Sequence, residues 1–246
     1  MITINFIGRI NKLNIALLTA GGVGSRMNMS IPKQFVHVND KPLIIYTLEK
    51  FERHPDIDAI VVTCLKGWEN ILRAYVKQFQ IKKLITIVES GDTGQDSIRN
   101  GLLEIEKRFS DDDNVIIHDG NRAMVSSEII SDCIVTTELK GCAIAAIPTV
   151  EVVLYTENET SSKKSYPREY LKRTQTPHGF PVKTILGMHR EAIVKGITNT
   201  AASVDMAIAL GQEVYLSLGS EKNLKITTVD DLEIFKALLT YEKENG

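Results

Sequence analysis

Short, uninterrupted apolar runs organise the first part of the chain. They lie at residues 15–18, 59–62, 84–88, 115–117 and 142–147. Between them are longer segments in which apolar side chains recur every three or four residues, at 42–51, 68–79, 97–109 and 127–139. Runs without polar alternation are typical of strands that are buried on both faces. We therefore predict an α/β fold with a doubly wound, mostly parallel sheet that helices cover on both sides.

The pattern changes after residue 147, where the chain becomes strongly polar. Residues 156–164 are too polar to lie in a core, and strand-like stretches flank them at 150–155 and 169–171. We expect residues 150–171 to form a projecting β-arm, which serves either as a mobile loop or as a dimer clasp. Regular structure then resumes, with helices expected at 182–195 and 202–210, strands at 213–218 and 224–227, and a final helix opened by a capping box at 228–231.

Composition narrows the class of protein. Hydrophobic residues make up 43% of the 246 residues and charged residues 24%, which is ordinary globular usage and excludes disorder. A formal net charge of -2 gives no support to nucleic-acid binding through bulk charge. Because no apolar run approaches ~18 residues and the start lacks a signal-peptide core, we expect a cytoplasmic protein without a membrane segment. We assign residues 13–246 to a single domain and residues 1–12 to an N-terminal extension.

A glycine-rich loop follows the first predicted strand, at the edge where open α/β sheets bind ligands. Its glycines, Gly21, Gly22 and Gly24, let backbone N–H groups close around phosphate oxygens. The loop lacks the Gly-Lys-Ser/Thr ending of a P-loop, and a methionine replaces the third glycine of the dinucleotide fingerprint. Arg26 and Lys33 add two cations, which suit a triphosphate. A tight strand-to-helix turn with solvated cations explains the loop equally well.

Asp119 follows the predicted strand at 115–117. A carboxylate at this end of a strand, beside bound phosphates, is well placed to hold Mg²⁺. The same aspartate could cap the next helix or pair with Arg122, and taken alone these structural roles are favoured. We interpret His118 as a packed histidine at the strand end rather than as a base.

The loop at residues 90–97 follows the third predicted strand. Its backbone groups, together with Asp92 and Ser97, could bind the edge of a nucleotide base. An ordinary capped loop before a helix has the same composition, so this segment by itself does not decide between the two interpretations.

Taken together and in chain order, these segments resemble a known family. The matching motifs lie at residues 20–27 with 32–35, 91–97 with 100–102, 118–122, 175–177 with Phe180, and 223–227 with Asp230 and Leu232. They resemble the CTP-dependent cytidylyltransferases that act on polyol phosphates. These are the 2-C-methyl-D-erythritol 4-phosphate enzymes of isoprenoid synthesis and the ribitol-5-phosphate enzymes of teichoic-acid and capsule synthesis. The resemblance implies a Rossmann-like nucleotidyltransferase fold and transfer of CMP from CTP to a polyol phosphate, with release of pyrophosphate.

The resemblance also implies a role for each matched residue. The catalytic residues would be Arg26 and Lys33, which grip the triphosphate, and Lys225, which approaches the α-phosphate. The residues that would bind CTP are Ala20, Gly21, Gly22, Gly24, Gly91, Asp92, Ser97 and Asp119. Asp119 would also bind Mg²⁺, the cofactor that the family implies. The acceptor would be bound by Arg122, Arg168 and Thr176, with Arg168 on the 150–171 arm, which in this family reaches into the partner subunit of a homodimer.

Departures from the family pattern gather on the acceptor side. Val152 lacks a hydroxyl expected to touch the acceptor's phosphate, and Ala201 with Ala202 replaces a Thr-Asp pair. Elsewhere, Gly94 replaces an arginine in the loop at residues 90–97, and Gly120, which directly follows Asp119, replaces an alanine. We therefore expect cytidylyl transfer to an altered acceptor. Ribitol 5-phosphate or a related polyol phosphate is the first candidate, and 2-C-methyl-D-erythritol 4-phosphate is the alternative.

Two other classes of function stay open from the sequence. A dinucleotide-dependent oxidoreductase is suggested by Gly-x-Gly after the first strand, although the second strand does not end in the acidic residue that binds the ribose. A nucleotide-binding module without turnover is suggested by the departures at Gly94, Val152, Ala201 and Ala202. Pyrophosphate release from CTP with a panel of polyol phosphates would separate these classes.

Overall fold

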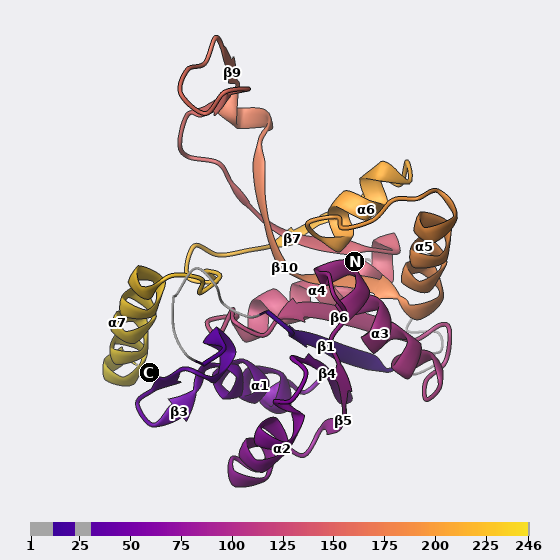
Figure 1. Ribbon diagram of the computed structural model, residues 1–246, viewed down its shortest axis with the longest axis vertical. Coiled ribbons are helices and arrows are strands. Elements are labelled where there is room, and N and C mark those ends of the chain that lie inside the picture. The colour runs from indigo at the N-terminus through magenta and orange to yellow at the C-terminus, as the bar shows by residue number, and fades with distance from the viewer. Residues whose placement is uncertain (1–11, 23–30, 246) are drawn as a thin grey trace, which may run out of the picture.

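A seven-stranded sheet forms the centre of the protein (Figure 1). The computed structural model describes residues 12–22 and 31–245. Across the sheet the strands lie in the order β11 (Leu216–Leu218), β7 (Ala143–Pro148), β10 (Lys172–Pro181), β6 (Asn114–Asp119), β1 (Asn14–Ala20), β4 (Ala59–Cys64) and β5 (Leu84–Glu89). Neighbouring strands are parallel except that β10 runs antiparallel to both β6 and β7. The predicted doubly wound, mostly parallel α/β sheet is confirmed.

Helices cover both faces of this sheet. One face packs against α1 (Leu43–Arg53), α2 (Glu69–Gln78) and α4 (Ser127–Lys140), and the other against α3 (Gly94–Glu106), α5 (Val182–Val194) and α6 (Ser203–Ala209). Strand β1 has no alternation of polar and apolar residues because both of its faces are buried. Ala16 and Leu18 belong to the first core and Ile15 and Leu17 to the second, and all four have 0% exposure.

Local capping signals set several helix ends. Thr93 accepts a hydrogen bond from the backbone N–H of Asp96 at 3.0 Å, so α3 begins at Gly94 rather than at the predicted residue 97. The last helix, α7 (Val229–Asn245), has the predicted capping box. Thr228 Oγ1 accepts from the N–H of Asp231 at 3.2 Å, and the Asp231 carboxylate accepts from the N–H of Thr228 at 2.8 Å.

Two expected strands are absent and one observed strand was not expected. Residues 224–227 form no strand, because the backbone N–H of Ile226 bonds to the carbonyl of Asn121 in a loop rather than to a neighbouring strand. Residues 169–171 do not extend the arm as a strand, since Arg168–Tyr170 forms a 3-10 turn. Strand β10 was not predicted, and its pairing with β7 shifts register between Thr174 and His178.

The expected arm is present and projects from the body of the molecule (Figure 1). Its two short strands, β8 (Val153–Tyr155) and β9 (Lys164–Tyr166), pair with each other in antiparallel fashion and not with the central sheet. Several apolar side chains on the arm are exposed, among them Val152 at 73%, Leu154 at 60% and Tyr170 at 82%. Exposed apolar side chains that gather on one segment are typical of an interaction site.

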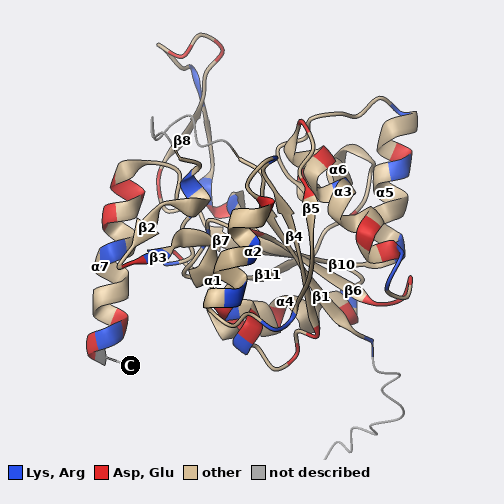
Figure 2. Ribbon diagram, turned by 60° about the horizontal axis from the view of Figure 1, so that its bottom comes forward, with Lys and Arg blue, Asp and Glu red and all other residues tan. Residues whose placement is uncertain are grey.

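Charged residues of both signs are interspersed on α5 and α7 (Figure 2). Among the described residues, no helix is long and apolar enough to cross a membrane. Residues 1–11 of the expected N-terminal extension lie outside the described part of the chain.

Candidate functional site

A cavity of about 570 Å³ opens at the carboxyl ends of β1 and β6. Strand β4 lies on one side of β1 and β6 on the other, so the order of strands along the chain reverses here. Open α/β sheets bind ligands at such a point because the loops on either side diverge and leave a crevice. The loops after β1, β5 and β6 line the cavity together with parts of β10 and α6.

One side of the cavity, which we call the glycine wall, consists of residues 20–22 and 91–97. A Cβ atom added to Gly21 would lie 2.4 Å from Cβ of Ser90, and one added to Gly91 would lie 2.4 Å from Cβ of Asp96. These close approaches require glycine at both positions. Ser97 Oγ accepts from the N–H of Gly91 at 3.1 Å and donates to the carbonyl of Thr93 at 2.8 Å, which fixes the loop against α3.

A short turn, η2 (Lys33–Phe35), lies against the glycine wall. Gln34 is buried and donates from Nε2 to the carbonyl of Ala20 at 2.7 Å, and Phe35 stacks on Trp68 with ring centroids 4.7 Å apart. Lys33 lines the cavity, and its Cε would lie 3.6 Å from a Cβ added to Gly22. Packing of the next two residues therefore places the Lys33 ammonium beside the loop after β1.

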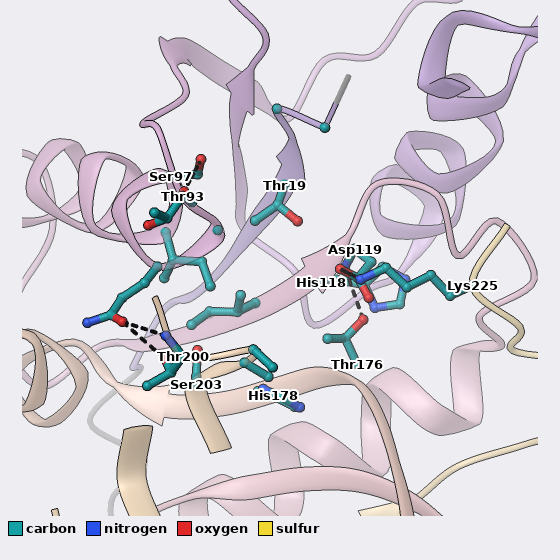
Figure 3. Close-up of a pocket in the computed structure, with 18 of the residues that line it drawn as sticks. Thr19, Thr93, Ser97, His118, Asp119, Thr176, His178, Thr200, Ser203 and Lys225 are labelled. Carbon is teal, nitrogen blue, oxygen red and sulfur yellow. Dashed lines mark hydrogen bonds and ion pairs between the residues drawn. The ribbon is translucent and has the colours of Figure 1, made fainter. Parts of the chain in front are cut away.

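The charged end of the cavity consists of Asp119, Arg122, Thr176 and Lys225 (Figure 3). Lys225 Nζ lies 3.0 Å from one carboxylate oxygen of Asp119, and Arg122 Nε lies 2.9 Å from the other. The backbone N–H of Asp119 donates to Thr176 Oγ1 at 3.0 Å. Arg122 also donates to the carbonyl of Asn223 at 2.7 Å, so three distant parts of the sequence meet here.

The electrostatics keep Asp119 ionised. Burial by itself would raise the pKa of this carboxyl group, but the neighbouring charges of Lys225 and Arg122 hold the pKa well below its usual range. His118 is fully buried and donates from Nε2 to the carbonyl of Arg122 at 3.1 Å. Burial lowers the pKa of His118 to about 4, so the ring is neutral near pH 7, in agreement with its interpretation as a packed residue.

The opposite, uncharged end of the cavity consists of Gln95, His178, His189, Thr200 and Ser203. Gln95 Oε1 accepts from the backbone N–H of Thr200 at 3.0 Å and from its hydroxyl at 3.1 Å, which ties the loop before α6 to α3 (Figure 3). The sequence did not single out His178, His189 or Ser203, because histidines in regular elements and a serine at a helix start are ordinary in cores and caps. The sequence signals near them were the departure at residues 201 and 202 and the family motifs at 91–97 and 175–177.

The structure brings most of the predicted site residues into this one cavity. Those that line it are Ala20, Gly21, Gly22, Lys33, Gly91, Asp92, Ser97, Asp119, Arg122, Thr176 and Lys225. Gly24 and Arg26 lie outside the described residues. Arg168 does not reach the cavity of its own chain: it is exposed on the arm, where it donates to the carbonyl of Val150 at 2.9 Å.

The positions that depart from the family pattern differ in their surroundings. A Cβ added to Gly120 would lie 2.6 Å from Cδ1 of Ile44 and 2.8 Å from the carbonyl oxygen of Thr19, so the loop after β6 is packed too tightly for a side chain. Gly94 lines the cavity with no atom within 4 Å of such a Cβ. Ala201 and Ala202 also line the cavity, whereas Val152 is exposed on the arm.

The donor set at Asp119 suits one kind of metal site. Within the described ranges, no group of three or more His, Cys, Asp or Glu side chains could hold a metal by itself. Mg²⁺ commonly takes one or two carboxylates and completes its shell with water and substrate phosphate oxygens. An ionised aspartate beside a nucleotide-sized cavity therefore fits a magnesium ion that arrives with a phosphate ligand.

Comparison with known proteins gives consistent matches over nearly the whole chain. Residues 14–241 match the family described as IspD: 2-C-methyl-D-erythritol 4-phosphate cytidylyltransferase. The chain is 42% identical over 231 residues to ribitol-5-phosphate cytidylyltransferase of Lacticaseibacillus paracasei, with 93% of this chain and 98% of that protein covered. It is 35% identical over 231 residues to 2-C-methyl-D-erythritol 4-phosphate cytidylyltransferase of Clostridium novyi, with 92% and 96% covered.

A solved structure gives the same result for the fold. The crystal structure of 2-C-methyl-D-erythritol 4-phosphate cytidylyltransferase (IspD) from Francisella tularensis matches with a TM-score of 0.77 at 26% sequence identity. The match covers 91% of this chain and 98% of that chain.

Proposed function

Since this chain belongs to the IspD family of cytidylyltransferases, we propose that it transfers CMP from CTP to a phosphorylated polyol and releases pyrophosphate. The observation that carries the proposal is the meeting, in one cavity, of the glycine wall with the charged end around Asp119 and Lys225. The glycine wall suits a nucleoside, and the charged end suits the phosphates of the two substrates that react with each other.

Ribitol 5-phosphate is the proposed acceptor. Relatives at 41% and 42% identity carry the name ribitol-5-phosphate cytidylyltransferase, whereas relatives named for 2-C-methyl-D-erythritol 4-phosphate are 34–35% identical. The departures at Ala201 and Ala202 line the cavity, which supports an acceptor different from methylerythritol phosphate. The latter is the alternative acceptor, and the test below includes it.

The reaction needs no general base. A phosphate monoester has a second pKa near ~6, so the acceptor is largely a dianion at neutral pH and can attack without losing a proton to the protein. One of its oxygens bonds to the α-phosphorus of CTP while the bond from that phosphorus to the bridging oxygen breaks, and pyrophosphate leaves. The neutral, buried His118 is consistent with such a mechanism.

The chain's own residues position the substrates and stabilise charge. We assign Lys33 and Lys225, together with Arg26, to the negative charge that develops as pyrophosphate leaves. Ala20, Gly21, Gly22, Gly24, Gly91, Asp92 and Ser97 bind the nucleoside and inner phosphates, and Arg122 and Thr176 bind the acceptor's phosphate. Asp119 holds Mg²⁺, which when bound neutralises charge on the phosphate oxygens.

A homodimer through the 150–171 arm completes the proposal. Arg168 lies away from the cavity of its own chain, and the arm exposes Leu154 and Tyr170. Both features are explained if the arm packs against a second copy and delivers Arg168 to the acceptor there. Light scattering should then give the mass of a dimer, and deletion of residues 153–166 should give a monomer that turns over acceptor poorly.

The function is tested by pyrophosphate release from CTP and Mg²⁺ with ribitol 5-phosphate, 2-C-methyl-D-erythritol 4-phosphate and glycerol 3-phosphate, with mass detection of the product. The expected result is a CDP-polyol, formed with the highest kcat/KM from ribitol 5-phosphate. If kcat/KM is highest with methylerythritol phosphate, that compound and not ribitol 5-phosphate is the acceptor. Tight CTP binding with no turnover of any acceptor would show a nucleotide-binding module and overturn the proposal.

A further inference from the structure

Three buried polar atoms at the uncharged end of the cavity lack hydrogen-bond partners. They are Nε2 of His178, Nε2 of His189 and Oγ of Ser203, for which residues 12–22 and 31–245 provide no partner. The three side chains are only 2%, 2% and 3% exposed and line the cavity. Buried polar groups are nearly always hydrogen-bonded, because an unpaired one keeps the full cost of losing water. Three such atoms at one end of the cavity therefore point to a ligand that supplies the partners, and two more lining residues, Gln34 and His118, each have one unpartnered atom elsewhere in the cavity.

The three atoms come from three different elements. His178 is on β10, His189 on α5 and Ser203 at the start of α6. All three elements pack into the same core on one face of the sheet, through neighbours such as Phe180 and Met206, and this packing holds the three side chains in place. The surface is therefore formed before a ligand binds, because its polar atoms lie on helices and a strand and not on a loop that could move to pair them.

The chemistry of this surface suits hydroxyl groups. Burial lowers the pKa of both His178 and His189 to about 4, so near pH 7 each ring is neutral and offers either a donor or an acceptor nitrogen. The Ser203 hydroxyl both donates and accepts. Hydroxyl groups match all three atoms, since a hydroxyl can donate a hydrogen bond to each of them or accept one from it. Asp205, exposed on the same helix and lining the cavity, would accept from hydroxyls and repel phosphate.

The other contacts at this end complete a site for a polyol chain. The hydroxyl and backbone N–H of Thr200 already donate to Gln95, so Thr200 forms part of the cavity wall and does not need a ligand as partner. Ile98, Ala202 and Met206 line the same cavity and offer apolar surface to C–H groups. A chain of carbons that each carry one hydroxyl presents both kinds of surface.

We propose that His189 and Ser203, with His178 beside them, bind the hydroxylated carbon chain of the acceptor and select its hydroxyl pattern. The acceptor's phosphate then lies at the charged end, next to Lys225. This inference rests on the proposed function and deepens it, because it assigns acceptor specificity to residues outside the motifs that carry the family resemblance.

The test compares two buried serines. In Ser203→Ala, kcat/KM for the best polyol phosphate of the panel should fall about five- to tenfold, the usual effect of one lost hydrogen bond, while the KM for CTP stays unchanged. Ser217→Ala is the matched control, because Ser217 is buried on β11 and does not line the cavity. It should leave both constants unchanged. His189→Leu should act like Ser203→Ala, and His189→Gln, which keeps a polar atom near the position of Nε2, should restore most of the loss.

Analogues of the acceptor sharpen the test. For at least one deoxy analogue that lacks a single hydroxyl, Ser203→Ala should cause a smaller loss than it does with the parent acceptor, since the partner of Ser203 is already missing. If Ser203→Ala behaves like Ser217→Ala while the wild-type protein transfers CMP normally, the inference is wrong and the proposed function stands. An equal loss with every analogue, or an altered KM for CTP, would also overturn it. If the wild-type protein transfers CMP to no polyol phosphate, the proposed function itself fails.

Discussion

The two ends of the cavity meet beside β10 but are built in opposite ways. At the charged end the charged side chains already satisfy one another: Asp119 binds both Lys225 and Arg122, and Arg122 donates to the carbonyl of Asn223. At the uncharged end, Oγ of Ser203 and Nε2 of His189 have no hydrogen-bond partner among the described residues. The charged end is therefore preorganised before substrate arrives, as electrostatic stabilisation of a transition state requires. The uncharged end is completed only by a ligand, which suits discrimination between acceptors, because a wrong acceptor leaves buried groups unpaired.

The largest expected effect comes from removing a cation beside the phosphates. Lys33→Ala and Lys225→Ala should each lower kcat by about 10²-fold or more, since each removes a preorganised group that stabilises developing charge. Lys222→Ala is the matched control, because this lysine lies on the same segment but over the ring of Tyr241 and not at the cavity. Steady-state kinetics with both substrates measure the effect. Unchanged kcat in either variant would remove that lysine from the mechanism.

The next effect concerns how tightly the charged end is packed. Gly120→Ala introduces the residue usual in the family, yet its Cβ would lie 2.6 Å from Cδ1 of Ile44. Overpacking of this kind should lower the free energy of unfolding by about 1–3 kcal/mol. Gly94→Ala, where no atom lies within 4 Å, should leave the free energy of unfolding unchanged or raise it by up to about 1 kcal/mol. Urea denaturation of both variants would decide, and equal stability would show that the loop after β6 relaxes freely.

A smaller effect tests whether the arm serves the acceptor side only. Arg168→Ala should raise the KM for the acceptor about tenfold, the scale of one charge-assisted hydrogen bond, and leave the KM for CTP alone. Lys163→Ala, which removes a charge from the exposed tip of the same arm, should change neither constant. Weaker CTP binding in Arg168→Ala would contradict our division of the cavity.

The last effect depends on pH and concerns the three neutral histidines. The folded pKa of about 4 for His118, His178 and His189 lies below the unfolded value near ~6.5, so only the unfolded chain gains these protons in between. The contribution of these histidines to the free energy of unfolding should be fully present above about pH 6.5. It should fall as the pH drops toward 4, by about 1.4 kcal/mol per pH unit for each ring. Urea denaturation at about pH 6.5 and 5 measures this slope. His189→Gln should reduce the slope by about one ring's share, and an unchanged slope would show that His189 is protonated in the folded state.

The sequence predicts the parts of the fold that local signals determine. The apolar run of β1 and the capping box at Thr228 and Asp231 need no distant partner to be recognised. Strand β10 was missed because its place between β6 and β7 depends on pairing with distant strands, which no local pattern of residues 172–181 shows.

The same limit applies to the site. Asp119 was predicted because it ends an apolar strand, but its partner Lys225 is 106 residues away, and only the resemblance to a family brought the two together. His189 and Ser203 carry no local signal, since their significance comes from missing partners in three dimensions. The place of Arg168 depends on a second chain and stays a prediction.

The central claim, cytidylyl transfer to a polyol phosphate, is tested most directly by following labelled phosphorus from CTP. The protein is incubated with Mg²⁺, ribitol 5-phosphate and CTP labelled at either the α- or the γ-phosphorus, and the products are separated. We predict that the α-label appears in a CDP-polyol and the γ-label in pyrophosphate. Transfer of the γ-label to the polyol, or no transfer of the α-label to any polyol phosphate, would contradict the account.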